Sequence, residues 1–110
     1  MSDVSGMAQQ IVDYVRHYGG VSFVELERKI PGFKGDKALF FPSYPNVILW
    51  PWVSPEATEA LQLAVKEIEP RPCHLLVYMA DGKVPDMKIA KRLADYKTQR
   101  WLPVTFSMRK

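Results

Sequence analysis

The sequence predicts an α+β fold with three main helices and a small antiparallel sheet. Three segments show apolar residues at helical spacing between capping and breaking residues, and short β-branched or aromatic runs lie between and after them. At 110 residues, residues 1–110 are expected to form one domain, because this length is typical of a single hydrophobic core. A hydrophobic content of 47% with 25% charged residues is typical of globular rather than disordered chains.

The first helix is predicted over Met7–Tyr18. Its apolar residues at helical spacing are Ile11, Tyr14, Val15 and Tyr18. Gly19-Gly20 is expected to end it, because glycine adopts the backbone conformations that terminate helices. The second helix is predicted to start at Ser22, since Glu25 follows three residues later and completes a capping-box pattern. Its expected buried residues are Phe23, Leu26 and Ile30.

A third helix is predicted to begin at Ser54-Pro55-Glu56, which combines a hydroxyl cap, a proline at the first helical position and an acid in the first turn. Its expected core residues are Ala57, Leu61, Ala64, Val65 and Ile68. Pro70 and Pro72 are expected to stop it. Upstream, Phe33–Pro45 is expected to be irregular, and Asn46–Trp52 is expected to be a short strand halted at Pro51.

The last third of the chain is predicted to contain two further strands. His74–Met79 is the first of them, and Ala80-Asp81-Gly82 is typical of a hairpin turn. A short amphipathic helix is expected from Ile89, Ala90, Leu93 and Ala94. Leu102–Met108 is the last predicted strand, with Val104 and Phe106 on one face.

Cysteine usage and hydropathy predict a cytoplasmic protein. Cys73 is the single cysteine, so no intramolecular disulfide can form, which is typical of a reducing compartment. The first ten residues lack the basic flank and apolar run of a signal peptide. The longest apolar stretches, Ala38–Phe41 and Val47–Val53, are too short to span a bilayer, and no membrane partner is expected.

Catalytic and metal-binding patterns are missing from the sequence, so the chain is predicted not to be an enzyme and to use no cofactor. His74 follows Cys73 directly, and neighbours on a strand point to opposite faces, so the two cannot form a nucleophile–base pair. With His17 as the only other histidine, no set of ligands has the spacing of a zinc site. Phosphate-loop and dinucleotide-binding motifs are also absent.

Charge is distributed unevenly along the chain. Residues 1–82 hold seven Lys and Arg against ten Asp and Glu, whereas residues 83–110 hold eight against two. A basic segment of this kind is typical of a surface that contacts phosphates, although a solvated basic surface has the same composition. The candidate nucleic-acid-binding residues are Lys83, Lys88, Lys91, Arg92, Lys97 and Arg100.

Aromatic residues are concentrated between positions 40 and 52, with prolines among them. One interpretation is a loop that packs over the core; the alternative is an exposed surface for a protein partner or unstacked bases. In the second case the candidate partner-binding residues are Phe41, Tyr44, Trp50 and Trp52. Two functions therefore stay open: a small non-catalytic protein that binds nucleic acid through its basic C-terminal segment, or a protein–protein interaction module without DNA binding.

The segment Ala8–Ile30, with Gly19-Gly20-Val21-Ser22 between its helices and Phe23-Val24-Glu25-Leu26 opening the second, resembles the start of a winged helix-turn-helix domain. The helix Ser54–Ile68 and the strands after it are similar to the third helix and wing of that family. The resemblance covers about two-thirds of the chain and is of the kind seen in small phage or mobile-element accessory proteins. It implies a winged-helix-like fold and DNA binding.

The third predicted helix departs from a DNA-reading helix in its charge. Its expected exposed residues are Glu56, Thr58, Glu59, Gln62, Lys66, Glu67 and Glu69. Four carboxylates against one ammonium give this face a net charge of −3, which phosphates repel. If the fold is a winged helix, this helix is not expected to read a major groove, and contacts would fall to the basic C-terminal segment.

Overall fold

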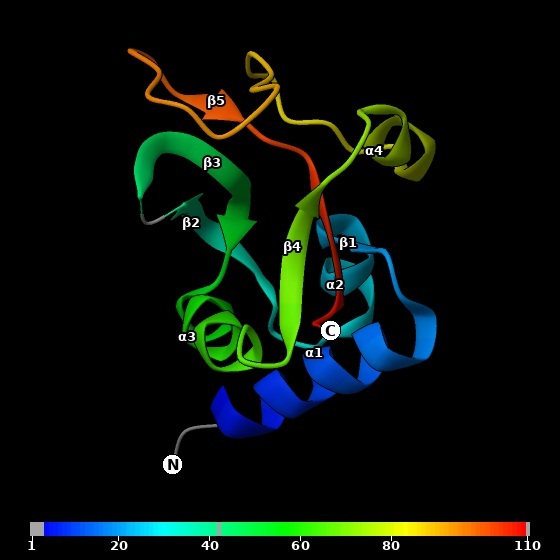
Figure 1. The fold of residues 1–110 in the computed structure, drawn as a ribbon. Helices are drawn as coiled ribbons and strands as arrows, with labels where there is room; N and C mark the ends of the chain where they lie inside the picture. The colour runs from blue at the N-terminus through cyan, green and yellow to red at the C-terminus, as the bar shows by residue number, and fades with distance from the viewer. Residues whose placement is uncertain (1–3, 42, 110) are drawn as a thin grey trace.

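The computed structural model describes residues 4–41 and 43–109. Over these residues the chain has four helices and six strands, the strands forming two three-stranded sheets (Figure 1). The helices are α1 (Val4–Tyr18), α2 (Phe23–Lys29), α3 (Pro55–Ala64) and α4 (Leu76–Asp81). The strands are β1 (Val21–Ser22), β2 (Lys34–Phe41), β3 (Tyr44–Val53), β4 (Ile68–Pro72), β5 (Arg100–Trp101) and β6 (Val104–Met108).

The two sheets differ in pairing. The first has the order β1-β6-β4 and is antiparallel throughout, with Phe106 of β6 opposite both Val21 and Pro70. The second has the order β2-β3-β5: β2 and β3 pair antiparallel with several register shifts, and β5 joins β3 in parallel, with Val47 opposite Arg100. The second sheet therefore brings residues about fifty positions apart in the chain side by side.

The prediction of a winged-helix-like fold with three main helices and one small antiparallel sheet is wrong. The described residues form an α+β structure, but they add a fourth helix, α4, and a second sheet that contains a parallel pair. Two strands of the second sheet, β2 and β3, come from the segment between α2 and α3, which the sequence predicted to be mostly irregular, and the third, β5, comes from the C-terminal part of the chain. The acidic third helix and the basic C-terminal segment therefore have to be judged by their own positions in the structure.

The predicted N-cap residues of α2 and α3, Ser22 and Ser54, are confirmed. The Ser22 hydroxyl accepts a hydrogen bond from the Glu25 amide, and the Glu25 carboxylate accepts one from the Ser22 amide, which completes the capping box of α2. At α3, the Ser54 hydroxyl accepts from the Ala57 amide at 3.0 Å and donates to the Gly32 carbonyl at 2.6 Å. These bonds satisfy amides that a helix N-terminus leaves without intrahelical partners.

The buried face of α1 is rotated slightly from the predicted one. Ile11 and Val15 are fully buried as expected, and Val12 joins them, whereas Tyr18 is 63% exposed. The last turn of α1 extends past the core, so the Tyr18 side chain has no buried apolar residues to pack against. Tyr18 packs instead against the rings of Tyr14 and His17 on its own helix.

Two segments predicted around the aromatic region have different secondary structure. Phe33–Pro45 is not irregular, because β2 occupies Lys34–Phe41 and pairs with β3. The predicted strand over Asn46–Trp52 is confirmed in position, but β3 continues through Pro51 to Val53. The bulges between β2 and β3 break the two-residue alternation that would have marked β2 in the sequence.

Downstream of α3, several predicted elements are wrong. The third helix ends at Ala64, and Ile68 begins β4 instead of lying on that helix. The predicted strand His74–Met79 is replaced by α4, whose C-cap Gly82 has a φ of 78°, so Ala80-Asp81-Gly82 ends a helix and is not a hairpin turn. The predicted short helix over residues 89–94 is irregular chain. The last strand is confirmed as β6, with Val104 and Phe106 buried.

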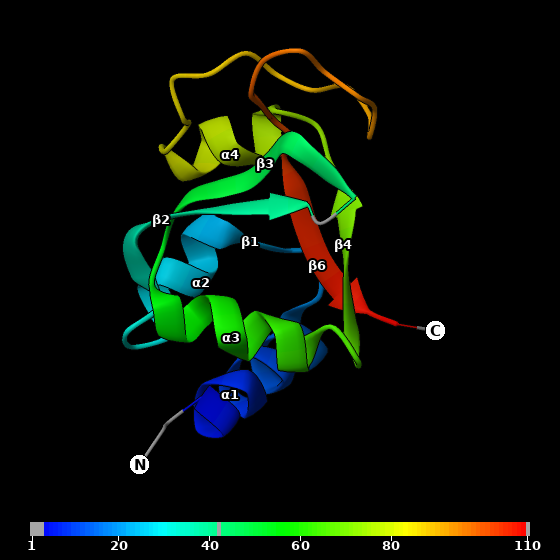
Figure 2. The same ribbon diagram turned by 90° about the vertical axis from the view of Figure 1, so that its left-hand side faces the viewer.

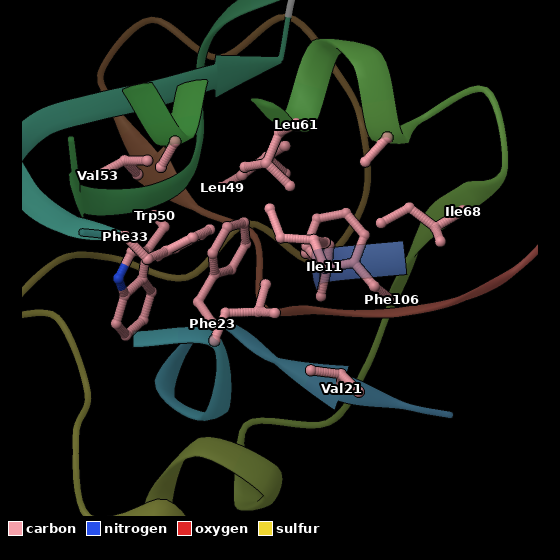
Figure 3. Close-up of a cluster of buried hydrophobic side chains, with 14 of the residues drawn as sticks. Ile11, Val21, Phe23, Phe33, Leu49, Trp50, Val53, Leu61, Ile68 and Phe106 are labelled. Carbon is pink, nitrogen blue, oxygen red and sulfur yellow. The ribbon is translucent and has the colours of Figure 1, made fainter. Parts of the chain in front are cut away.

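The core is continuous across both sheets and the four helices of the described residues. Phe23 of α2 stacks on Trp50 of β3 with ring centroids 5.6 Å apart and contacts Phe106 of β6 edge-on, as the close-up in Figure 3 illustrates. Tyr78 of α4 and Trp101 of β5 pack against Trp50 from the other side. Aromatic pairs of this geometry add to the stabilisation from burial itself.

The helices α1 and α3 pack against each other at one end of the molecule (Figure 2). The opposite end carries α4, β5 and the irregular segment between them, as both views show (Figures 1 and 2). The candidate site lies at this second end.

Candidate nucleic-acid interface

The basic segment predicted from the sequence follows α4 and ends at the first residue of β5. Its residues 83–100 are here called the basic loop. It has no helix and a single isolated bridge within it. The basic loop is held at the end of the molecule remote from α1 (Figures 1 and 2). It contains six Lys and Arg against two Asp.

Backbone hydrogen bonds close the second half of the basic loop into a ring. The Trp101 amide donates to the Lys88 carbonyl at 2.9 Å, and the Ala90 amide donates to the Trp101 carbonyl at 2.8 Å. The Asn46 side chain of β3 donates to the Tyr96 carbonyl at 2.6 Å. The loop is therefore anchored at both ends and at its tip region to buried strands, even though it lacks regular structure.

Four polar residues of this closed loop surround one hollow, here called the cation pocket, of about 350 Å³. Its lining residues are Ile89, Lys91, Arg92, Ala94, Tyr96 and Arg100. Three of the six sequence-predicted nucleic-acid-binding residues, Lys91, Arg92 and Arg100, thus meet around a shared space. Lys88 and Lys97 are exposed on the same loop but do not line the pocket.

Arg100 and Tyr96 stack on each other in the cation pocket. The Arg100 guanidinium lies over the Tyr96 ring, with 4.8 Å from Cζ to the ring centroid. The Tyr96 hydroxyl donates to the Arg92 carbonyl at 3.0 Å, which fixes the ring. The Nε atom of Arg100 is buried and has no hydrogen-bond partner within the described part of the chain. The stacked guanidinium therefore lines the pocket and forms no ion pair with a described residue.

Apart from Lys83, the other cations of the loop also form no ion pair with a described carboxylate. In residues 4–41 and 43–109, ion pairs involve Arg16, Arg71, Lys83 and Arg109 among the cations. None of Lys88, Lys91, Arg92, Lys97 or Arg100 forms one with a described carboxylate. The positive potential of the loop is therefore available to an external anion.

Lys83 has a different environment from the other predicted nucleic-acid-binding residues. Its Nζ lies 2.7 Å from Glu27 Oε1 and 4.8 Å from the centroid of the Trp52 ring. The Glu27 side chain is only 7% exposed and also accepts a 2.8 Å hydrogen bond from Trp50 Nε1. Lys83 therefore joins the start of the basic loop to α2 and β3, and its charge is already compensated. No local sequence pattern indicates this partner, because Glu27 lies 56 positions away from Lys83.

The predicted partner-binding aromatics do not form a common exposed surface. Trp50 is 0% exposed at the centre of the aromatic core, so it cannot contact a partner in this conformation. Phe41, Tyr44 and Trp52 are half-buried and pack against the core. The region 40–52 is a strand hairpin whose rings mainly serve packing.

Two apolar surfaces were missed by the sequence reasoning. The first is on and after α4, where Leu76 is 61% and Met79 54% exposed, with Val77 and Val84 beside them in sequence. The second is a groove of about 370 Å³ between the β2–β3 hairpin and α3. Its lining residues include Leu39, Phe40, Leu49, Leu61, Val65 and Phe106. A run of consecutive apolar residues gives no indication of which ones a short helix will leave outside.

Redox and metal chemistry find little support in the described residues. Burial raises the pKa of the Cys73 thiol, which lowers its thiolate fraction at neutral pH. Within the part of the chain that the structure describes, no three His, Cys, Asp or Glu side chains gather as a metal site would require. Its helices also include none with the length and apolar character needed to cross a bilayer.

Comparison of the chain with protein-family models, with curated proteins and with solved structures finds no match.

Proposed function

We propose that this protein is a non-catalytic nucleic-acid-binding protein that contacts phosphates through the basic loop. The observation that carries the proposal is the convergence of Lys91, Arg92 and Arg100 around one pocket, where none of them forms an ion pair with a described carboxylate. Lys88 and Lys97 extend the same positive surface. Charge of this kind attracts polyanions and releases their counterions on binding.

The acidic helix α3 supports the same orientation. It lies at the opposite end of the molecule from the basic loop (Figures 1 and 2), so its carboxylates do not oppose a phosphate at the loop. Contacts to phosphates position a protein without reading bases. Binding through this surface is therefore expected to show little sequence preference.

Salt-dependent binding tests the proposal. Affinity for a labelled oligonucleotide, measured by fluorescence anisotropy between about 50 and 200 mM salt, should fall steeply as salt rises. The double substitution Lys91→Gln and Arg92→Gln removes two phosphate contacts, so the slope of log affinity against log salt should become shallower by about 1.4–1.8.

A matched control has the same charge change at the other end of the molecule: Arg16→Gln with Lys66→Gln. Arg16 forms only exposed ion pairs, whose loss costs little stability. This control variant should keep the wild-type slope. Absence of binding at about 50 mM salt, or an equal loss in both double variants, would contradict the proposal.

The second candidate function is a protein–protein interaction module, and the exposed apolar residues of α4 favour it. Leu76 and Met79 are more than half exposed, which is unusual for large apolar side chains. The surface that the sequence predicts for this function, the aromatic region 40–52, is less suitable because Trp50 is buried. Replacing Leu76 and Met79 with serine should abolish partner binding if this function applies and should leave nucleic-acid affinity unchanged if the first applies.

A further inference from the structure

We infer that the cation pocket takes one nucleotide unit of a single strand, with its phosphate on Arg100 and its base against the Tyr96–Arg100 side of the pocket. This inference rests on the proposed nucleic-acid binding and names the form of nucleic acid that the site would select.

The first step is the shape of the site. The pocket of about 350 Å³ is hollow, and its lining combines cations with the apolar side chains of Ile89 and Ala94. Its volume lies within the range of about 300–1,000 Å³ that is typical of small-ligand sites. A flat basic surface would suit a duplex backbone equally well, but an open hollow lined by both cations and apolar side chains suits a group that enters it.

The second step is the state of Arg100. Its backbone is fixed by pairing with Val47 of β3, and its guanidinium rests on the Tyr96 ring. The Nε atom is buried. The two terminal guanidinium nitrogens are not fully buried, and they form no hydrogen bond with any described residue. The terminal nitrogens can therefore donate together to one phosphate, in the planar geometry that distinguishes arginine from lysine.

The third step is the position of Tyr96. Hydrogen bonds from its hydroxyl to Arg92 and from Asn46 to its carbonyl hold the residue in place before any ligand arrives. A preorganised aromatic and guanidinium pair loses little conformational entropy on binding and offers the kind of surface on which unpaired bases stack. Bases in a duplex are stacked and paired, so only a single strand can supply one without first being opened.

The charge-conserving substitution Arg100→Lys tests this directly. A labelled strand of about 15 nucleotides is measured alone and as its duplex at about 50 and 200 mM salt. We expect affinity for the single strand to fall about tenfold while duplex affinity and both salt slopes stay near the wild-type values. Arg16→Lys, the same change on α1, should alter neither form.

A second pair of variants separates stacking from folding. Tyr96→Leu removes the ring and should weaken single-strand binding about tenfold, whereas Tyr96→Phe keeps the ring, loses only the hydroxyl bond to Arg92, and should weaken binding much less. Circular dichroism and thermal unfolding verify that each variant is folded. If Tyr96→Leu does not fold, Arg100→Lys still decides the question.

The outcomes distinguish the two proposals. If Lys91→Gln with Arg92→Gln flattens the salt slope but Arg100→Lys leaves the ratio of single-strand to duplex affinity unchanged, the proposed function stands and the single-strand inference is overturned. An equal loss on both forms in Arg100→Lys overturns it as well. If neither form binds at about 50 mM salt, the proposed function itself fails, and the inference with it.

Discussion

Tyr78→Phe is the substitution for which the structure allows the sharpest stability prediction. The Tyr78 side chain is completely buried, and its hydroxyl joins three parts of the fold. It donates to the Val104 carbonyl of β6 at 2.7 Å and accepts from the Phe23 amide of α2 at 3.0 Å. Phenylalanine retains the ring and its contacts with Trp50 and Trp101 but removes both hydrogen bonds.

The expected cost is about 2–4 kcal/mol of unfolding free energy. Each buried group left without a partner costs about 1–3 kcal/mol, and part of this is returned because phenylalanine has no hydroxyl to desolvate. For a domain of this size the loss corresponds to a decrease in Tm of roughly 8–17 °C. The packing contribution should not change, since the two rings have the same shape.

Urea unfolding followed by tryptophan fluorescence measures this difference. Tyr18→Phe is the matched control, because Tyr18 is exposed and its hydroxyl makes no hydrogen bond with a described residue. The control should change the unfolding free energy by less than about 0.5 kcal/mol. A comparably small change in Tyr78→Phe would refute the assignment of the hydroxyl as a buried link between α2 and β6.

The same residue predicts how stability depends on alkaline pH. Burial raises the pKa of Tyr78 above its ordinary value of 10.0. The unfolded chain then loses this proton before the folded one, so the stabilisation is complete below pH 10 and is lost as pH rises above it. The slope attributable to Tyr78 is at most about 1.4 kcal/mol per pH unit. Tyr78→Phe should remove that part of the slope, which unfolding measurements at pH 9 to 11 would detect.

Three further substitutions test the fold and the base of the basic loop. Leu61→Ala should cost about 2–4 kcal/mol by chemical denaturation, because Leu61 is buried beside the apolar groove, and a loss below about 0.5 would place it outside the core. Ser54→Ala should cost about 1–2 kcal/mol and speed hydrogen exchange of the Ala57 amide, since it removes the cap and the bond to Gly32; unchanged exchange would contradict the cap. Glu27→Gln should lower the unfolding free energy measurably, because Lys83 and Trp50 both donate to this nearly buried carboxylate, and an unchanged value would contradict that pairing.

Local signals explain which parts of the fold the sequence predicted. Ser22 with Glu25 and Ser54 with Pro55 place both helix starts correctly, because capping depends on residues within one turn. The strand β2 was missed because Lys34–Phe41 is mostly exposed and its bulges remove the two-residue alternation. For α4, the run Leu75–Met79 has the composition of a strand, but only tertiary packing of Tyr78 into the aromatic core determines the helix.

For the candidate site too, local signals were predictable from the sequence and long-range contacts were not. Composition predicted that the basic segment matters, and it named the three cations that line the pocket. It could not separate them from Lys83, whose compensation by Glu27 depends on a contact across 56 positions. Composition also could not identify Arg100 as the pocket cation whose backbone pairs with a strand, because the pairing of β5 with β3 is equally long-range.

The aromatic core and the cation pocket are adjacent in sequence at Arg100 and Trp101, and this arrangement separates stability from binding in a testable way. Trp101 is fully buried against Trp50 and Tyr78, so the strand that presents Arg100 is held by the core. The Tyr78 hydroxyl, however, bonds to β6 and α2 and not to β5 or the basic loop. Tyr78→Phe should therefore lower the unfolding free energy while leaving oligonucleotide affinity unchanged at temperatures where the variant is folded. Arg100→Lys should instead leave the unfolding free energy unchanged and lower the affinity for the single strand.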